Sequence, residues 1–108
     1  MTTTKTTLEQ LTDIIKERRS STAEKSYTKS LIEAGTGKCA KKMGEEAVEA
    51  VIAAVSEDDD AFKEETADLL YHLLVLLEQK NVSMKEVEDI LATRMGLSGH
   101  EEKAQRTQ

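Results

Sequence analysis

The chain has 108 residues, which is enough for one domain (residues 1–108) and argues against two. It has no proline and only five glycines, a composition that disfavours strands joined by tight turns. The formal net charge of −6 argues against nucleic acid as a partner, because that role needs a basic surface, but it allows a phosphorylated ligand whose charge a metal offsets.

Composition also predicts the fold class and the compartment. Ala, Leu, Glu and Lys dominate, and these strong helix formers predict an all-α fold. The lone Cys39 rules out an internal disulfide, fits a reducing compartment and has no partner that would make it reactive. The polar first residues lack a secretory signal, and the longest apolar run is too short for a bilayer. We therefore expect a cytoplasmic protein without a membrane partner.

Two helices are predicted in the first third of the chain. Thr7 followed by Gln10 has the form of a capping box and predicts the start of the first helix. Its apolar face would carry Leu8, Leu11, Ile14 and Ile15. A second, short helix is expected over about residues 23–34, ended by Gly35, with residues 35–37 as a clear break.

A third helix is predicted over about residues 38–55. At about 100° per residue, one broad arc is apolar and the opposite arc is charged. The apolar arc would comprise Ala40, Met43, Ala47, Val48, Val51, Ala54 and Val55. The charged arc would comprise Lys38, Lys42, Glu45, Glu46 and Glu49.

The fourth predicted helix, about residues 60–79, has an acidic first half and a second half that is apolar on every side over residues 69–77. A helix that is apolar all round has to be buried all round. Because few short helices are available to surround it, we expect a second copy of the chain to complete the bundle as a homodimer. The alternative is a monomer whose own helices cover this surface.

A capping box at Ser83 and Glu86 predicts a fifth helix that ends near Gly96. The ends of the chain, about residues 1–6 and 98–108, are polar and are expected to be flexible. The sequence therefore predicts a small all-α bundle of four to five helices.

Two acidic pairs carry the functional hypothesis. Glu46 and Glu49 are three residues apart on the third helix, and Glu65 and Asp68 are three apart on the fourth. Residues at this spacing project from one helix face, so antiparallel helices could present four carboxylates to one small volume. Such a cluster repels itself unless a hard cation such as Mg²⁺ or Mn²⁺ is bound, and phosphate oxygens could complete the coordination.

The alternative is an ordinary solvated acidic face. Two features favour a site: Asp68 adjoins the apolar run and is expected near the interior, and the alanines of the third helix permit close helix approach. Pattern alone leaves both interpretations open.

Three lysines, Lys38, Lys41 and Lys42, crowd the first turns of the third helix, where the helix dipole disfavours positive charge. A phosphate docked at the Gly37 turn would reverse that penalty, because free amides point there. Ordinary pairing of Lys42 with Glu45 or Glu46 is the alternative.

Other motifs are incomplete. Residues 35–38 resemble part of a P-loop, but Ile32 and Cys39 replace residues that the motif requires, and no predicted strand precedes it. No Glu-x-x-His pairs support a di-iron bundle. His72, inside the apolar run, is expected to be a core histidine rather than a ligand.

Residues 44–49 and 65–68 resemble the EExxE…ExxD signature of the MazG-like all-α nucleotide pyrophosphohydrolases. Residues 26–28, 38–46 and 67–77 are more specifically similar to the phosphoribosyl-ATP pyrophosphatase family, and the likeness covers roughly residues 8 to 104.

The resemblance implies magnesium-dependent hydrolysis of phosphoribosyl-ATP to phosphoribosyl-AMP and pyrophosphate, the second step of histidine biosynthesis. By position, it implies that metal is held by Glu46, Glu49, Glu65 and Asp68. Glu45 would be a further ligand or would orient the attacking water. Lys38 and Lys42 would meet phosphates, with Arg18 and Arg19 as weaker candidates. The alternatives are a MazG-like dNTP pyrophosphatase and a non-catalytic helical dimerisation module.

Overall fold

Five helices account for nearly all of the chain that the structure describes, a computed structural model covering residues 4–21 and 26–96. They are α1 (Thr7–Arg19), α2 (Tyr27–Ala34), α3 (Thr36–Ser56), α4 (Asp59–Gln79) and α5 (Met84–Arg94). Within these residues no strand occurs, so the predicted all-α fold is confirmed. None of these helices has both the length and the apolar character that crossing a membrane requires.

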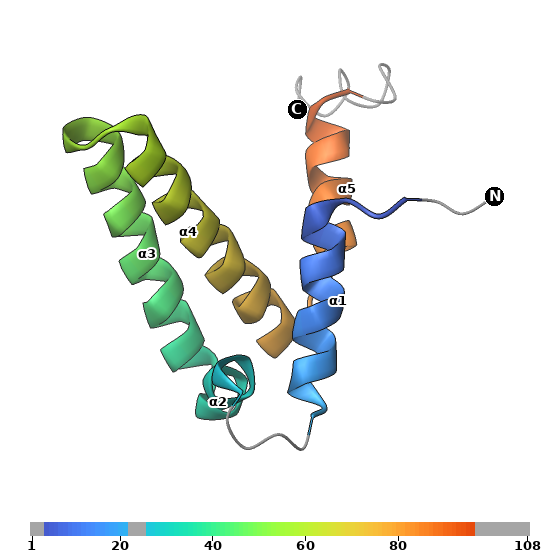
Figure 1. Ribbon diagram of the computed structural model, residues 1–108. Helices are drawn as coiled ribbons and strands as arrows, with labels where there is room; N and C mark the ends of the chain where they lie inside the picture. The colour runs from blue at the N-terminus through green and yellow to red at the C-terminus, as the bar shows by residue number, and fades with distance from the viewer. Residues whose placement is uncertain (1–3, 22–25, 97–108) are drawn as a thin grey trace.

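The two longest helices form an antiparallel hairpin, α3–α4 (Figure 1). The short α2 lies at the base of this hairpin, and α1 packs against α2 and the C-terminal half of α4 (Figure 1). Helix α5 follows α4 after a short turn and points away from the base beside α1 (Figure 1). The hairpin therefore extends beyond the rest of the bundle and carries its acidic middle section away from the core.

The core lies where the first four helices converge at the base. Its buried members come from α1, α2, α3 and α4, and they are Ile15, Leu31, Ile32, Cys39, Leu74 and Val75. The Cys39 thiol donates a hydrogen bond to the Leu31 carbonyl at 3.1 Å, and burial raises the pKa of this thiol. Both features agree with the expectation of an unreactive cysteine.

The start of α1 differs by one residue from the predicted capping box. The Thr6 hydroxyl accepts a hydrogen bond from the Glu9 amide at 3.1 Å, and the Thr6 amide donates to the Glu9 carboxylate at 2.7 Å. Thr7 is already helical, so the box predicted from Thr7 and Gln10 was wrong by one position. The box at Ser83 and Glu86 is confirmed at the start of α5.

A single residue joins α2 to α3. Gly35 ends α2 and also precedes the first residue of α3, with a φ of 101° that favours glycine. The predicted three-residue break was therefore too long, because Thr36 and Gly37 already belong to α3. Ser26 caps α2 through the Lys29 amide, so this helix begins later than predicted, and residues 22–25 lie outside the described part.

The apolar face predicted for α3 was also wrong. Its buried residues are Cys39, Ala50 and Ala53, whereas Val51 and Val55 are 62% and 81% exposed. Helix α3 packs on α4 through small side chains, which allow close approach. The larger apolar residues are consequently left on the outside of the hairpin; with Ile52 and Phe62 they include Val48, Val51 and Val55.

The apolar second half of α4 is less buried than predicted. Within residues 69–77 only His72, Leu74 and Val75 are buried, and the other six are half-buried. Helix α5 has no buried residue. The end segments expected to be flexible lie outside the described residues, apart from residues 4–6, where Thr6 caps α1.

Candidate metal and phosphate site

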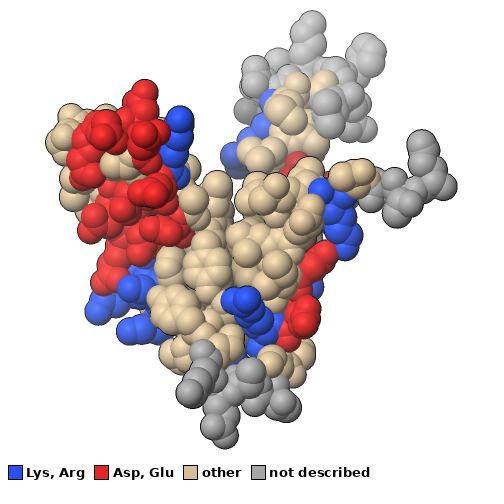
Figure 2. Space-filling model, viewed as in Figure 1, with Lys and Arg blue, Asp and Glu red and all other residues tan. Residues whose placement is uncertain are grey.

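Three carboxylates meet on the α3–α4 hairpin. Glu46 of α3 and Glu65 and Asp68 of α4 each offer one oxygen, and these atoms all lie within 4.8 Å of one another. We call these three residues the acidic cluster. Figure 2 shows acidic side chains gathered over this hairpin, with basic side chains toward its base. Asp68 is exposed rather than near the interior as predicted, because it lies on the solvent side of α4, where the apolar run has not yet begun.

Helix geometry explains why these residues meet. Glu65 and Asp68 are three positions apart, so they project from neighbouring turns of one face of α4. The antiparallel packing of α3 then brings Glu46 opposite them. Glu49, about one turn further along α3, is not part of the group within 4.8 Å. Its charge nevertheless acts on Glu65.

The electrostatics of the acidic cluster favour a cation. Desolvation raises the pKa of Glu65, and the negative charges of Asp68, Glu49 and Glu46 raise it further. Like charges at this separation disfavour one another's ionised forms, and a bound cation reverses that effect. Carboxylate oxygens are the ligands that hard divalent cations prefer, so the donor set fits Mg²⁺ or Mn²⁺.

A buried histidine lies directly behind the acidic cluster. The His72 Nε2 atom is 3.9 Å from the Glu46 Oε1 atom, and His72 is 6% exposed. Burial lowers the pKa of His72, while the charge of Glu46 opposes that shift. His72 is buried as the sequence predicted, but its proximity to Glu46 was not predicted, because it depends on the register between α3 and α4.

Two tyrosines complete the surroundings of His72. The Tyr71 ring meets it edge-on with the centroids 4.9 Å apart, and the Tyr27 ring does so at 6.2 Å. The Tyr71 hydroxyl shares a 2.5 Å hydrogen bond with the hydroxyl of the buried Thr28, which ties α4 to α2. Sequence reasoning assigned no role to Tyr27, whose position at the start of α2 gave no periodic signal.

The predicted phosphate-binding lysines lie toward the base of α3. The Lys42 ammonium is 3.4 Å from the Glu45 carboxylate, so the alternative of ordinary ion pairing is observed. This pairing raises the pKa of Lys42, and the phenol of Tyr27 adds to the effect. Lys38 is exposed on the first turn of α3. That turn has no side-chain cap, but it begins after Gly35 and not at Gly37 as predicted.

Arg19 is held elsewhere. Its guanidinium donates to the Glu78 carbonyl at 2.6 Å, to the Glu78 carboxylate at 3.0 Å and to the Asn81 side chain at 2.9 Å. Glu78 is ten residues beyond Asp68 on α4, a rise of about 15 Å. The structure therefore does not bring Arg19 to the acidic cluster, and Arg18 is exposed on the same helix, α1.

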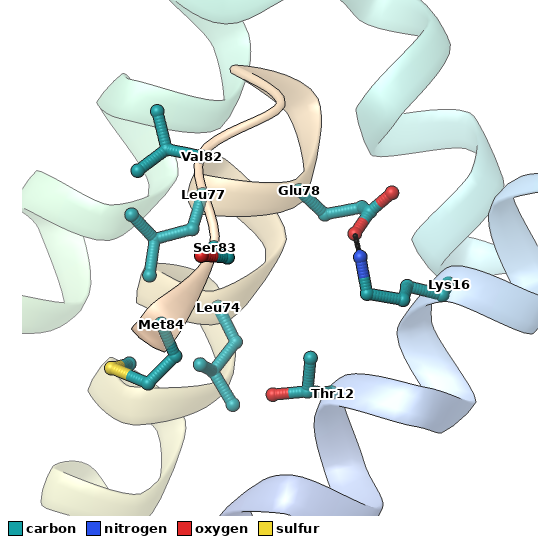
Figure 3. A pocket seen from close by; sticks show the side chains of 8 residues that line it. All are labelled: Thr12, Lys16, Leu74, Leu77, Glu78, Val82, Ser83 and Met84. Atoms are coloured by element: carbon teal, nitrogen blue, oxygen red, sulfur yellow. Dashed lines mark ion pairs between the residues drawn. The ribbon is translucent and has the colours of Figure 1, made fainter. Parts of the chain in front are cut away.

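A small pocket lies beside this ion pair, between α1, the end of α4 and the start of α5 (Figure 3). The Lys16 ammonium reaches the Glu78 carboxylate across one side of it at 3.1 Å. Leu74, Leu77 and Met84 supply apolar walls. None of the acidic cluster lines this pocket, which belongs to the packing of α1 on α4.

An all-α hairpin that presents clustered carboxylates from two antiparallel helices, with lysines toward its base, agrees with the resemblance to the all-α nucleotide pyrophosphohydrolases. Comparison with known proteins specifies the family. The family model described as phosphoribosyl-ATP pyrophosphohydrolase matches residues 8–95. The chain belongs to this family.

Individual members of the family match this chain over almost their whole length. The phosphoribosyl-ATP pyrophosphatase of Azorhizobium caulinodans is 52% identical over 106 residues, covering 98% of this chain and 97% of that protein. Phosphoribosyl-ATP pyrophosphatase 1 of Rhodopseudomonas palustris is 52% identical over 93% of this chain and 94% of its own. The phosphoribosyl-ATP pyrophosphatase of Jannaschia sp. is 48% identical over 94% of this chain and 99% of its own.

Proposed function

We propose that this chain hydrolyses the α–β phosphoanhydride of phosphoribosyl-ATP, giving phosphoribosyl-AMP and pyrophosphate in the second step of histidine biosynthesis. We place the reaction in the cytoplasm, with Mg²⁺ as cofactor and Mn²⁺ as a substitute. The observation that carries this proposal is the convergence of Glu46, Glu65 and Asp68 in a chain of this family.

The acidic cluster would hold the metal, and Glu49 would join it. Glu49 is about one turn from Glu46, and its charge already acts on Glu65, which supports its joining the acidic cluster when metal binds. A bound divalent cation would neutralise phosphate charge and lower the pKa of a bound water.

The remaining charged groups would bind the substrate phosphates and orient the attacking water. Glu45, adjacent to the acidic cluster, would be a further ligand or would hold the attacking water. Lys42 lies about 6 Å along α3 from Glu46, and Lys38 about 12 Å, so both could meet phosphates of a substrate lying along the hairpin. Of the two weaker candidates, Arg18 stays available on the surface, whereas Arg19 is engaged by Glu78.

We also propose a homodimer. The outer face of α3 exposes Val51 and Val55, and α5 exposes Ile90, Leu91 and Met95 by half or more. Extended apolar surfaces of this kind mark interfaces more often than free surface. A second copy is the simplest occupant, because one patch can then cover its symmetry mate.

The deciding experiment measures pyrophosphate release from phosphoribosyl-ATP and from a panel of dNTPs, with and without Mg²⁺. We expect turnover of phosphoribosyl-ATP that disappears when EDTA removes the metal. A preference for any dNTP would instead support the MazG-like activity. No turnover, together with no heat on titration with Mg²⁺ and nucleotide, would support a non-catalytic module.

A further inference from the structure

Tyr27 is an aromatic residue left half in solvent beside the proposed reaction centre. It is 53% exposed, although the two rings it meets belong to the half-buried Tyr71 and the buried His72. Its ring lies nearly parallel to that of Tyr71, at 18° and 6.5 Å, and nearly perpendicular to that of His72. Ring neighbours on the protein side thus fix its orientation while part of the ring stays accessible.

Tyr27 is linked to the acidic cluster by a short series of contacts. From Glu46 to His72 the closest atoms are 3.9 Å apart, and from His72 to Tyr27 the ring centroids are 6.2 Å apart. Lys42 lies one turn before Glu46 on α3, on the side toward Gly35 and α2. Carboxylates, a cation and an aromatic ring therefore follow one another down the hairpin toward α2.

This order matches the order of groups in a nucleotide. The α–β phosphoanhydride would lie at the acidic cluster, Lys42 would meet the α-phosphate on the side that carries the ribose, and the nucleoside would extend beyond it toward α2. Aromatic side chains bind bases by stacking, because every base has a π-face and the ring loses little freedom. We propose that Tyr27 is the platform on which the nucleobase of the substrate stacks, an inference that rests on the proposed function.

The competing role for Tyr27 is to shield His72 from water, and substitutions separate the two roles. Leucine at this position keeps an apolar cover but has no π-face, whereas phenylalanine keeps the ring. We expect Tyr27→Leu to raise the KM for phosphoribosyl-ATP about tenfold, with kcat little changed. Tyr27→Phe should stay within about twofold of the unaltered chain in both constants, because stacking needs no hydroxyl.

Two further measurements test whether the Tyr27→Leu variant keeps its metal site and whether Tyr27 contacts a bound nucleotide. The Mn²⁺ affinity of Tyr27→Leu, followed by electron paramagnetic resonance, should equal that of the unaltered chain, because the carboxylates are unchanged. The chain has two tyrosines and no tryptophan, so Tyr71→Phe leaves Tyr27 as the sole source of tyrosine emission. Addition of Mg²⁺ and α,β-methylene-ATP should quench that emission.

An unchanged KM in Tyr27→Leu would overturn the inference, as would a KM that rises equally in Tyr27→Phe. Emission unaltered by saturating α,β-methylene-ATP would also overturn it. Failure of the unaltered chain to release pyrophosphate from phosphoribosyl-ATP would refute the proposed function instead. In that case, quenching by the nucleotide still reports whether Tyr27 meets a base.

Discussion

The imidazole of His72 and the carboxylate of Glu46 lie 3.9 Å apart across the interface between α4 and α3. One member of the acidic cluster, Glu46, is therefore backed by a buried ring, while the other two, Glu65 and Asp68, extend from α4. Groups in this position orient ligands, and their loss commonly weakens metal binding ten- to a hundredfold, as an order of magnitude.

His72→Leu tests this contact. We expect Mn²⁺ affinity to fall about tenfold, because Glu46 loses the polar group behind it, while the helical content remains. Isothermal titration with Mn²⁺ measures the effect. Tyr71→Phe is the control, because it alters the aromatic neighbour of His72 and leaves the contact between His72 and Glu46 unchanged. Equal affinities for His72→Leu and the unaltered chain would contradict the positioning role.

Glu65→Gln should have opposite effects on stability and on function. Without metal, removing one negative charge relieves repulsion in the acidic cluster, so the Tm in EDTA should rise or stay constant. With Mg²⁺, the unaltered chain should gain stability by binding, and the variant should gain little and lose pyrophosphate release at least about a hundredfold. Thermal scans with and without Mg²⁺ check the direction of both changes in Tm. The exposed neighbour Glu64, changed to Gln, should behave like the unaltered chain.

Glu49→Gln examines the residue that lies just outside the acidic cluster. We expect turnover to be abolished with the fold intact, because the proposed function places Glu49 among the ligands once metal binds. Rates of pyrophosphate release and far-ultraviolet circular dichroism provide the readouts. Rates like those of the unaltered chain would limit the ligand set to the three residues that already converge.

Glu78→Gln should change the response of stability to acid. Desolvation alone would raise the pKa of Glu78, but hydrogen bonds from Arg19 and Lys16 lower it below its usual 4.5. The stabilisation is therefore complete above about pH 4.5 and is lost as the pH falls through the lower folded value.

At neutral pH the variant should lose about 1–3 kcal/mol of unfolding free energy, because charged hydrogen bonds are removed. Its stability should then decline less steeply than that of the unaltered chain as the pH falls below about 4.5. Urea titrations over this range measure both slopes. Parallel slopes would show that Glu78 makes no special contribution.

Ile90→Glu probes the proposed homodimer at a site that contributes nothing to the buried core. The side chain is 55% exposed, so a charge there should leave the helical content unchanged. If α5 packs against a second copy, the mass measured by sedimentation should fall from about 24 kDa, twice the 12.0 kDa chain, to about 12 kDa. Asp89→Lys, exposed on a different face of the same helix, should retain the larger mass. A monomeric unaltered chain would refute the dimer.

Helix number and type followed from composition and from local signals, because capping residues and breaks act within a few positions. The acidic spacing also predicted that four carboxylates could meet, and three of them, Glu46, Glu65 and Asp68, do so, whereas Glu49 is not in the group. The buried face of α3 could not be predicted in the same way. Its valines and alanines form a broad apolar arc, and close packing on α4 selected the alanines Ala50 and Ala53.

The aromatic surroundings of His72 were missed for a different reason. Tyr27 lies 45 positions before His72 in the sequence, and the two rings meet because α2 and α4 both pack at the base of the hairpin. No periodicity within one helix reports such a contact. Arg19 was likewise a phosphate-binding candidate only through the resemblance, whereas its partners are Glu78, near the C-terminal end of α4, and Asn81, just beyond that end.

Gly35, the single residue between α2 and α3, influences how α2 is oriented relative to the α3–α4 hairpin. Gly35 leaves no slack in the linkage, and its positive φ would be strained for any residue that bears a Cβ, although space for one exists. A change in the φ angle of Gly35 would reorient α2 and move Tyr27 away from Glu46. The placement of Tyr27 relative to Glu46 thus depends in part on the backbone conformation of a residue that belongs to neither helix.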